Sequence, residues 1–487
     1  MNSSPRLLPR WLWLLIGCTL PLTAVQGQQG YQASWHRGLL GTQLNPASVE
    51  AAPHARELLL GGVDLYAGNS HYATHQHAEF LAAALWQGLT AAPDQLPLFT
   101  RVDQPGFEFQ GQEALWSGSQ RNRLLGPGWA QRLEVDPDWF ERGLVRRSLY
   151  VQVMREEALT LRGVPLGLAQ AYAQGQPLSA MANNSLSSPQ LALEVRQWDA
   201  VQAGYGLTLG RGTRQLHLAA GGKLLSMGAF SRLQVDGLNL NPGANATGVQ
   251  DSSITWAYNP GFAAISRAGT PRRYQYFENS WGIAGHLGVI FQSLDYNRQP
   301  KWEVGASVQD FGAVQIWNLR HRRYEQVSGS LGPGQLSNLA QGAAGLDGWL
   351  EEFEGDTTHL AEGITERLPL RVTTHGKFRL PREGWALQID AQAAGLTTAA
   401  WQGTLRTTLA YEGKLIQCFF PVAADLAFAE EHLRLAAPRV GLIFSLGDLF
   451  IFGSDDLLGN LVQSGVRSGV AAARLFAGVH FPLQRDP

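Results

Sequence analysis

Apolar and polar residues alternate along many stretches of the chain. In WDAVQAGYGLTLG (residues 198–210), Val201 and Tyr205 fall on one face of an extended chain, and Gln202 and Thr208 fall on the other. Successive side chains of a β-strand point to opposite faces, so this period of two predicts a strand with one apolar face and one polar or small face. The same alternation predicts strands in QLHLAAGGKLLSM (215–227), GIAGHLGVIF (282–291), KWEVGASVQD (301–310), WALQIDAQA (385–393), GTLRTTLAYE (403–412) and RLFAGVHFPL (474–483).

Less regular alternation predicts further strands, and a few stretches favour helices instead. The weaker strand signals lie at residues 57–67, 146–154, 253–258, 369–378 and 439–447. Apolar residues at helical spacing lie at residues 77–89, 334–356 and 455–462. Turns rich in Gly, Asn or Pro separate many of the strands. No linker and no repeat of fixed period divides the chain, so we expect a single all-β domain.

Residues 1–27 have the pattern of an export signal peptide. Two arginines precede the apolar run WLWLLIGCTLPLTAV, and small residues stand just before Gln28. An alternative interpretation takes LIGC, which ends at Cys18, as a lipoprotein box. Once the signal is removed, Cys418 is the one cysteine left in the domain of residues 28–487, which predicts no internal disulfide.

The composition favours β-structure and argues against a strongly charged partner. The chain has 55 glycines, 15 tryptophans and 20 phenylalanines, whereas 16 % of its residues are charged and the formal net charge is −2. Aromatic residues are enriched in strands, and so small a net charge creates no strong field for nucleic acid. After the signal, no apolar run reaches the ~20 residues of a transmembrane helix. If the protein spans a membrane, it must do so as a closed barrel, because closure pairs every backbone group in lipid.

Two architectures fit alternating strands: a soluble β-sandwich buries the apolar faces, and a membrane barrel turns them outward to lipid. Three features favour the barrel. Isolated ionisable residues stand among glycines on the polar faces. Trp198, Trp302, Trp385 and Tyr411 lie near strand ends, where an interfacial aromatic belt would place them, and the last strand signal reaches almost to the C-terminus, as closure requires. The ionisable residues expected to face the lumen are His217, Lys223, His286, Glu303, Asp390 and Arg406.

Several segments, taken in order, resemble a known family. They are GLLGTQLNPASV (38–49), RNRLLGPGW (121–129), GGKLLSMG (221–228), ASVQDFGAVQI (306–316) and SLGDLFIFGSDDLLGNLV (445–462). Together they resemble an uncharacterised family of exported β-barrel proteins of Bacteroidota, domain of unknown function 5723. That family is similar in outline to long-chain fatty acid transporter barrels and to barrels associated with type IX secretion. The resemblance implies an outer-membrane barrel of about fourteen strands, which residues 38–48 or a helix after Tyr72 could occlude, and it implies no catalytic residues.

Other candidate chemistry is weak. His71 and His75 would share a helix face, as metal ligands do, but His77 would not, and apart from Glu79 nothing nearby completes a ligand set. The acidic residues within 351–356 lack the ligand spacing of a calcium loop. No ordered set of serine, histidine and acid is visible. We therefore expect no catalytic residue, no metal and no cofactor.

The sequence thus predicts an outer-membrane β-barrel that is not an enzyme. Its expected function is passive transport of small or hydrophobic solutes, or a role as a partner barrel in an envelope or secretion assembly. The lumen residues are expected to pair and brace the barrel, or to select what passes. The expected partner is the lipid bilayer, with any envelope protein unidentified and no nucleic acid. The alternative is a soluble exported β-sandwich that acts as a binding module.

Overall fold

The structure is a computed structural model whose described residues are almost entirely β-strand. The described ranges are 38–69, 72–74, 107–109, 115–165, 167–168, 186–210, 212–242, 247–259, 280–296, 299–317, 319–331, 363–394, 402–413, 416–429, 432–435, 439–446, 449–454 and 471–485. The short helices there include α2 (Gly38–Gly41), α3 (Ser48–Ala51) and α5 (Pro137–Glu141). Within these ranges, no helix is long and apolar enough to cross a bilayer.

Several expectations from the sequence fall outside the described residues. These are the signal peptide of residues 1–27 with Cys18, the three histidines near residue 75, the acidic residues within 351–356, and the helices expected at 77–89, 334–356 and 455–462.

The chain forms a closed, antiparallel β-barrel of 14 strands. Each strand pairs with the next along the barrel, and the last pairs with the first from His54↔Arg485 to Asn69↔Ala471. This closure leaves no free edge within the ring of 14 described strands, which confirms the predicted barrel and excludes the β-sandwich. The strands are β1 (His54–Asn69), β4 (Leu115–Leu133), β5 (Leu144–Pro165), β6 (Leu186–Leu209), β7 (Arg214–Pro242), β9 (Ser280–Leu294), β10 (Pro300–Trp317), β13 (Arg371–Arg379), β14 (Trp385–Ala394), β15 (Gln402–Glu412), β16 (Ile416–Ala429), β19 (Leu442–Leu446), β20 (Phe450–Ser454) and β21 (Ala471–Arg485).

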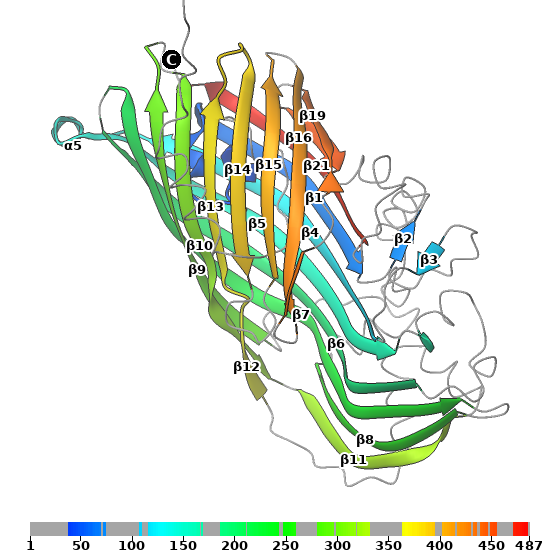
Figure 1. The fold of residues 1–487 in the computed structure, drawn as a ribbon. Helices are drawn as coiled ribbons and strands as arrows, with labels where there is room; N and C mark the ends of the chain where they lie inside the picture. The colour runs from blue at the N-terminus through cyan, green and yellow to red at the C-terminus, as the bar shows by residue number, and fades with distance from the viewer. Residues whose placement is uncertain are drawn as a thin grey trace, which may run out of the picture.

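The two ends of the barrel differ. One end carries brief connections, such as residues 210–213 and 380–384, together with α5 and the C-terminus (Figure 1). We call it the short-turn end. The other end, the long-loop end, carries connections such as residues 70–114 and 318–370. Barrels of outer membranes have this same asymmetry, with short turns on the periplasmic side.

Strand β7 runs beyond the barrel at the long-loop end. There it pairs with β8 (Thr247–Tyr258), and β8 pairs with β11 (Arg320–Leu331), so that these strands curve below the barrel in Figure 1. Trp256 and Tyr258 stack in the apolar cluster of this extension, with ring centroids 4.2 Å apart. The remaining short strands are β2 (Tyr72–Thr74), β3 (Phe107–Phe109), β12 (Gly363–Arg367), β17 (His432–Leu435) and β18 (Arg439–Val440).

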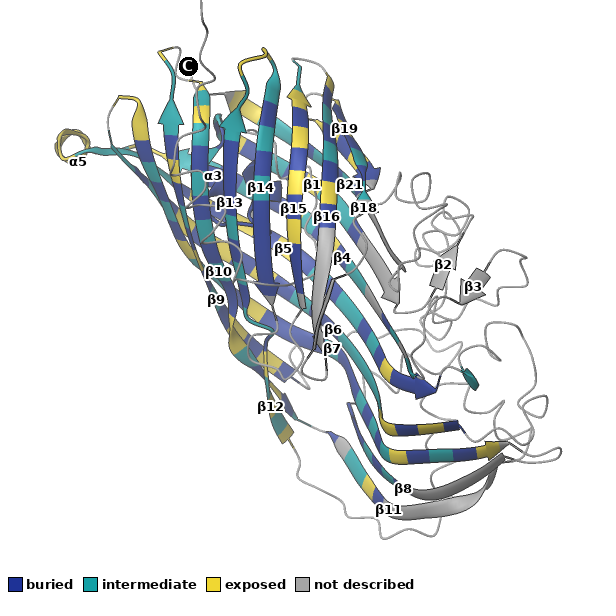
Figure 2. Cartoon of the chain, viewed as in Figure 1, coloured by how far each residue is buried: buried dark blue, intermediate teal, exposed yellow. Residues whose placement is uncertain are grey.

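Buried and exposed positions alternate along the strands, as the bands in Figure 2 show. On the outward faces, Val201 is 45 % exposed, Leu287 is 51 % exposed and Ile283 is 58 % exposed. On the inward faces, Gln202 and His286 are buried. A barrel that is apolar outside and polar inside has the pattern of one surrounded by lipid.

Three of the four residues expected in the aromatic belt lie near the short-turn end of their strands with partly exposed side chains. Trp385 and Tyr411 pack together near the short-turn end with ring centroids 5.4 Å apart. Trp302 packs likewise on Phe291, also at 5.4 Å. The prediction is wrong for Trp198, which is 7 % exposed inside the barrel. The Trp198 side chain points inward, as that of Ala200 does two residues later. The β6–β7 register shifts between Gln197 and Trp198.

Candidate functional site

The segment before β1 lies inside the barrel and fills part of the lumen. We call residues 38–52 the plug; they contain α2, α3 and the turn between them. Leu39, Leu44 and Ala47 are fully buried. Because the short helices are too brief to be stable alone, contacts with the barrel must hold this segment in place. Residues 38–48, one of the two segments that the sequence suggested could occlude the barrel, are thus buried inside it.

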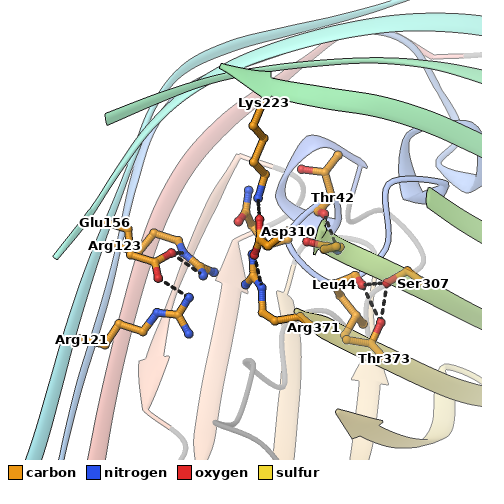
Figure 3. A network of polar contacts seen from close by, with 12 residues as sticks. Thr42, Leu44, Arg121, Arg123, Glu156, Lys223, Ser307, Asp310, Arg371 and Thr373 are labelled. Atoms are coloured by element: carbon orange, nitrogen blue, oxygen red, sulfur yellow. Dashed lines mark hydrogen bonds and ion pairs between the residues drawn. The ribbon is translucent and has the colours of Figure 1, made fainter. Parts of the chain in front are cut away.

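Side chains of the barrel strands bind the backbone carbonyls of the plug. The hydroxyls of Ser307 on β10 and Thr373 on β13 donate to the Leu44 carbonyl, at 2.6 and 2.7 Å (Figure 3). The Gln309 amide donates to the Thr42 carbonyl at 3.2 Å. Thr42 and Leu44 lie in the turn between α2 and α3, so these bonds satisfy carbonyls outside the two short helices.

Asn45 joins the plug to two barrel strands at once. Its Nδ2 donates to the carbonyl of Val289 on β9 at 3.0 Å and to that of Ala306 on β10 at 3.1 Å. Its Oδ1 accepts from the Ala47 backbone N–H at 2.9 Å. The amide can approach because residue 288 is glycine: a Cβ on Gly288 would lie 2.0 Å from Asn45 Oδ1.

A row of hydrogen-bonded side chains runs from the plug across five neighbouring strands. Thr208 donates to Glu50 of the plug at 2.8 Å, and its hydroxyl lies 2.9 Å from His217 Nδ1. The row continues through three more contacts: His217 to Gln292 at 3.3 Å, Gln292 to Glu303 at 3.4 Å and Glu303 to His375 at 3.4 Å. Buried polar groups need such partners, so the row stabilises both the lumen and the position of Glu50.

Two ion-pair clusters lie beside the plug. Asp310 accepts from Lys223 Nζ at 2.5 Å and from Arg371 Nε at 2.5 Å (Figure 3). Glu156 pairs with both Arg121 and Arg123. Asp310 has a backbone φ of 59°, an uncommon value for a residue other than glycine. It occupies a β-bulge, where the β9–β10 register shifts between Gln309 and Phe311.

The structure places all six predicted lumen residues inside the barrel, with buried side chains. Lys223, His217 and Glu303 belong to the contacts just described. His286 Nε2 lies 2.6 Å from the Tyr150 hydroxyl, across the lumen face of β6 and β7. The two remaining residues pair with each other, because Arg406 Nη2 lies 3.5 Å from Asp390 Oδ2. The structure therefore brings four of the six close to the plug contacts or ion-pair clusters and leaves Asp390 and Arg406 on β14 and β15.

Part of the barrel interior is apolar, which differs from the expected polar interior. One contiguous cluster joins Leu39 and Leu40 of the plug to side chains nearer the long-loop end. Those side chains include Met154, Trp198, Leu225, Met227, Phe230 and Ile316. A second part of the cluster lies on β16, β19, β20 and β21, where Phe419, Ile443, Ile451 and Phe476 face inward.

Sequence reasoning missed several residues of the site. Asn45, Glu50, Asp310 and Arg371 were not among the predicted lumen residues. Asn45 and Asp310 do lie in two of the segments that carry the family resemblance, so those segments were the available signal. No group of three or more His, Cys, Asp or Glu in the described ranges is placed to hold a metal ion.

Comparisons with known proteins give only distant similarities. No protein-family model and no curated protein matches the chain, so the resemblance to the Bacteroidota family stays a prediction. The chain is similar to a TodX deltaS2S3 mutant monoaromatic hydrocarbon channel, with 10% identity, a TM-score of 0.43, and coverage of 94% of this chain and 96% of that one. The CymD monoaromatic hydrocarbon channel gives 10% identity, a TM-score of 0.33, and coverage of 92% and 93%. A Pseudomonas aeruginosa FadL homologue gives 9% identity, a TM-score of 0.21, and coverage of 90% and 93%. All three TM-scores are too low to bear on function.

Proposed function

We propose that the chain is an outer-membrane barrel that lets small apolar solutes cross passively, with the plug as the element that must shift. In this orientation the short-turn end faces the periplasm, in keeping with the usual placement of short turns. The proposal does not include a catalytic role. Passive transport through a barrel needs only a continuous path through the lumen and a displacement of the plug.

The observation that carries the proposal is the apolar cluster between the plug and the long-loop end. A lumen for ions or sugars is expected to be polar along its length. Here Met227, Phe230 and Trp198 belong to the same apolar cluster as Leu39 and Leu40 of the plug. A solute without hydrogen-bonding groups loses no hydrogen bonds when it moves from water to such a surface. The burial of its apolar area lowers its free energy.

Several hydrogen bonds between the plug and the barrel are weak enough to be replaced by other hydrogen bonds when the plug moves. The bonds to the Leu44 and Thr42 carbonyls are neutral hydrogen bonds, each with a net contribution of ~0.5–1.5 kcal/mol. The barrel, in contrast, is held by continuous ladders along its strands. The plug also has charge-assisted contacts, between the Leu39 N–H and Glu57 and between Thr208 and Glu50. We expect its movement to require less free energy than opening of the barrel, which would break whole strand ladders.

The proposal is tested by uptake of the apolar fluorescent dye N-phenylnaphthylamine into intact Gram-negative cells that express the protein. We expect faster uptake than in cells that carry an empty vector. The Met227→Gln variant, which places an amide of similar size on the path, is expected to reduce the rate about fivefold or more, because an unpaired buried amide costs ~1–3 kcal/mol. The matched control is Val201→Thr, whose side chain faces outward.

Uptake at the empty-vector level by a folded barrel would refute the transport proposal. If that same barrel co-purified with one envelope protein, a partner-barrel function would replace it. Equal uptake by wild type and Met227→Gln would show that the apolar cluster does not line the path.

A further inference from the structure

An apolar groove lies on the outer face of the barrel. It has a volume of about 480 Å³ and is formed by β6, β7, β9, β10 and β13. This volume falls within the range of ~300–1,000 Å³ that is typical of ligand pockets. The outward side chains that line it include Leu207, Leu218, Ala220, Leu287, Val289 and Ala306.

The groove is hollow because small residues stand between large ones. Ala220 and Ala306 face outward among leucines and valines. Gly288 and Ser307, which face the lumen, also line the groove, so the backbone of β9 and β10 alone separates it from the plug. From the inside, Asn45 bonds the two strands at this point. The groove is therefore part of a braced region of the barrel.

Basic and aromatic residues stand above the groove at the short-turn end. Arg214 on β7 pairs with Ser293 on β9, and Ser293 pairs with Trp302 on β10. Arg214 and Lys301 are both exposed. Lys301 lies in a β-bulge, where the β9–β10 register shifts between Pro300 and Trp302, so it does not follow the inward alternation of Glu303. Among the described residues no acidic side chain pairs with either of them, and the nearby Asp295 pairs with Arg379.

The spacing of these residues matches an amphipathic ligand that lies along the strands. Arg214 is four residues from Leu218, or ~13 Å along β7 at ~3.3 Å per residue. β7 and β10 flank β9, so the backbones that carry Arg214 and Lys301 are separated by about two strand spacings, ~10 Å. Two long cationic side chains can close that gap around one phosphate, with charge-assisted hydrogen bonds. The Ser293 hydroxyl is a third donor, and Trp302 lies at the depth where indole rings meet lipid headgroups.

We propose that this surface binds one phospholipid of the surrounding bilayer, with an acyl chain in the groove and the phosphate between Arg214 and Lys301. The lipid belongs to the leaflet at the short-turn end. The inference depends on the barrel being in a bilayer and is independent of solute transport. It adds a binding site outside the lumen, on the opposite side of β9 and β10 from Asn45.

The test is native mass spectrometry of the whole barrel, purified in detergent and titrated with phosphatidylglycerol. We expect wild type to retain one lipid molecule. The double variant Arg214→Gln, Lys301→Gln and the groove-filling variant Ala306→Leu are each expected to weaken retention at least fivefold. The matched control, Arg382→Gln, removes a cation from the same rim, beside Trp385 and outside the groove, and is expected to bind as wild type does.

Glycerol 3-phosphate has the phosphate without acyl chains, so it tests whether the phosphate contacts suffice for binding without the groove. We expect that it is not retained. Heat-modifiable gel mobility verifies that each variant is folded. The proposal is overturned if folded wild type retains no lipid, or if the double variant retains as much as wild type. It is also overturned if Ala306→Leu binds normally, because the groove would then hold no chain.

Discussion

Asn45 shows how much can depend on one amide inside the barrel. Its two N–H groups are both used, on carbonyls of two different strands, and its oxygen accepts from the plug backbone. An asparagine is the one common side chain of this size that offers two donors and an acceptor in a fixed plane. Gly288 completes the arrangement, because any larger residue there would occupy the place of the amide.

The first prediction concerns Asn45→Asp, which keeps the shape of the side chain and removes both donors. A carboxylate would face the Val289 and Ala306 carbonyls, and the plug would lose ~2–4 kcal/mol of docking free energy, since unsatisfied buried groups cost more than the bonds they replace. We expect amide hydrogen exchange in residues 38–52 to accelerate at least tenfold, measured by mass spectrometry on the folded barrel.

The control for this prediction is Asn259→Asp, at another fully buried asparagine. Its Oδ1 accepts from the Phe230 N–H at 2.9 Å, a bond that the carboxylate retains, and its Nδ2 lies 3.5 Å from the Gly228 carbonyl. Plug exchange should stay near the wild-type rate. If Asn45→Asp also left plug exchange unchanged, Asn45 would not hold the plug.

At the residue scale the sequence could predict which way a side chain points, but not what it contacts. The period of two assigned His217, Glu303 and Arg406 to the inward face, where the structure places them. The contact between Thr373 and Leu44 joins residues 329 positions apart. No local pattern carries that information, so Asn45 and Asp310 could be recognised only through the segments of the family resemblance.

Among the elements, strands with one regularly apolar face were predictable, whereas strands that are apolar on both faces or interrupted by a register shift were not. On β16, Phe419 and Ala423 are buried inside the barrel while Val422 is 43 % exposed on the outside, so apolar residues occupy both faces. On β4, the register shift between Leu125 and Gly128 interrupts the alternation. Both strands therefore escaped the period-two signal, although each is as much a part of the barrel as β6.

The bulge of β10 is an element whose geometry depends on charge. Asp310 holds a left-handed backbone conformation while its carboxylate binds Lys223 and Arg371. Gln309 and Ser307, on the same strand, bond the plug. The ion pairs thus fix the strand that in turn positions the plug.

The second prediction is that Asp310→Asn destabilises the barrel by ~3–5 kcal/mol, the usual effect of removing one partner from a buried ion pair. Asparagine tolerates the left-handed conformation as well as aspartate does, so the variant tests charge and not backbone strain. The measurement is the urea unfolding free energy in detergent micelles or vesicles.

A control variant and a double variant accompany the Asp310→Asn measurement. Asp295→Asn breaks the pair with Arg379, whose side chains are 32% and 30% exposed, and such a pair is worth ~0–1 kcal/mol. Adding Lys223→Met to Asp310→Asn should recover part of the loss, because the unpaired buried ammonium is then gone. A loss below ~1 kcal/mol for Asp310→Asn would mean that the cluster does not stabilise the bulge.

For the whole molecule, the decisive property is which side of the cylinder is apolar. Exposed leucine, valine and phenylalanine side chains lie on the outward faces of the strands, and the plug and ion pairs are inside. A soluble protein would not expose so many large apolar residues. The sequence could predict this inversion because isolated ionisable residues stand among glycines on the polar faces and aromatic residues stand near strand ends. It could not predict that the lumen is partly apolar, since inward apolar residues look like any other strand residue.

The last prediction tests this inversion directly through Leu287→Arg. Leu287 lies at the centre of β9, faces outward and is 51 % exposed. An arginine at the bilayer midplane of such a barrel costs ~2–4 kcal/mol, whereas near the interface it costs ~0–1 kcal/mol. The matched control is Leu449→Arg, at 46 % exposure in the turn between β19 and β20. We expect the unfolding free energy in phospholipid vesicles to fall by the larger amount for Leu287→Arg alone. In detergent micelles, where water reaches the outer face more easily, the difference between the two variants should shrink. Equal effects of both variants in vesicles would mean that the outward face does not meet hydrocarbon, and the membrane placement of the barrel would have to be abandoned.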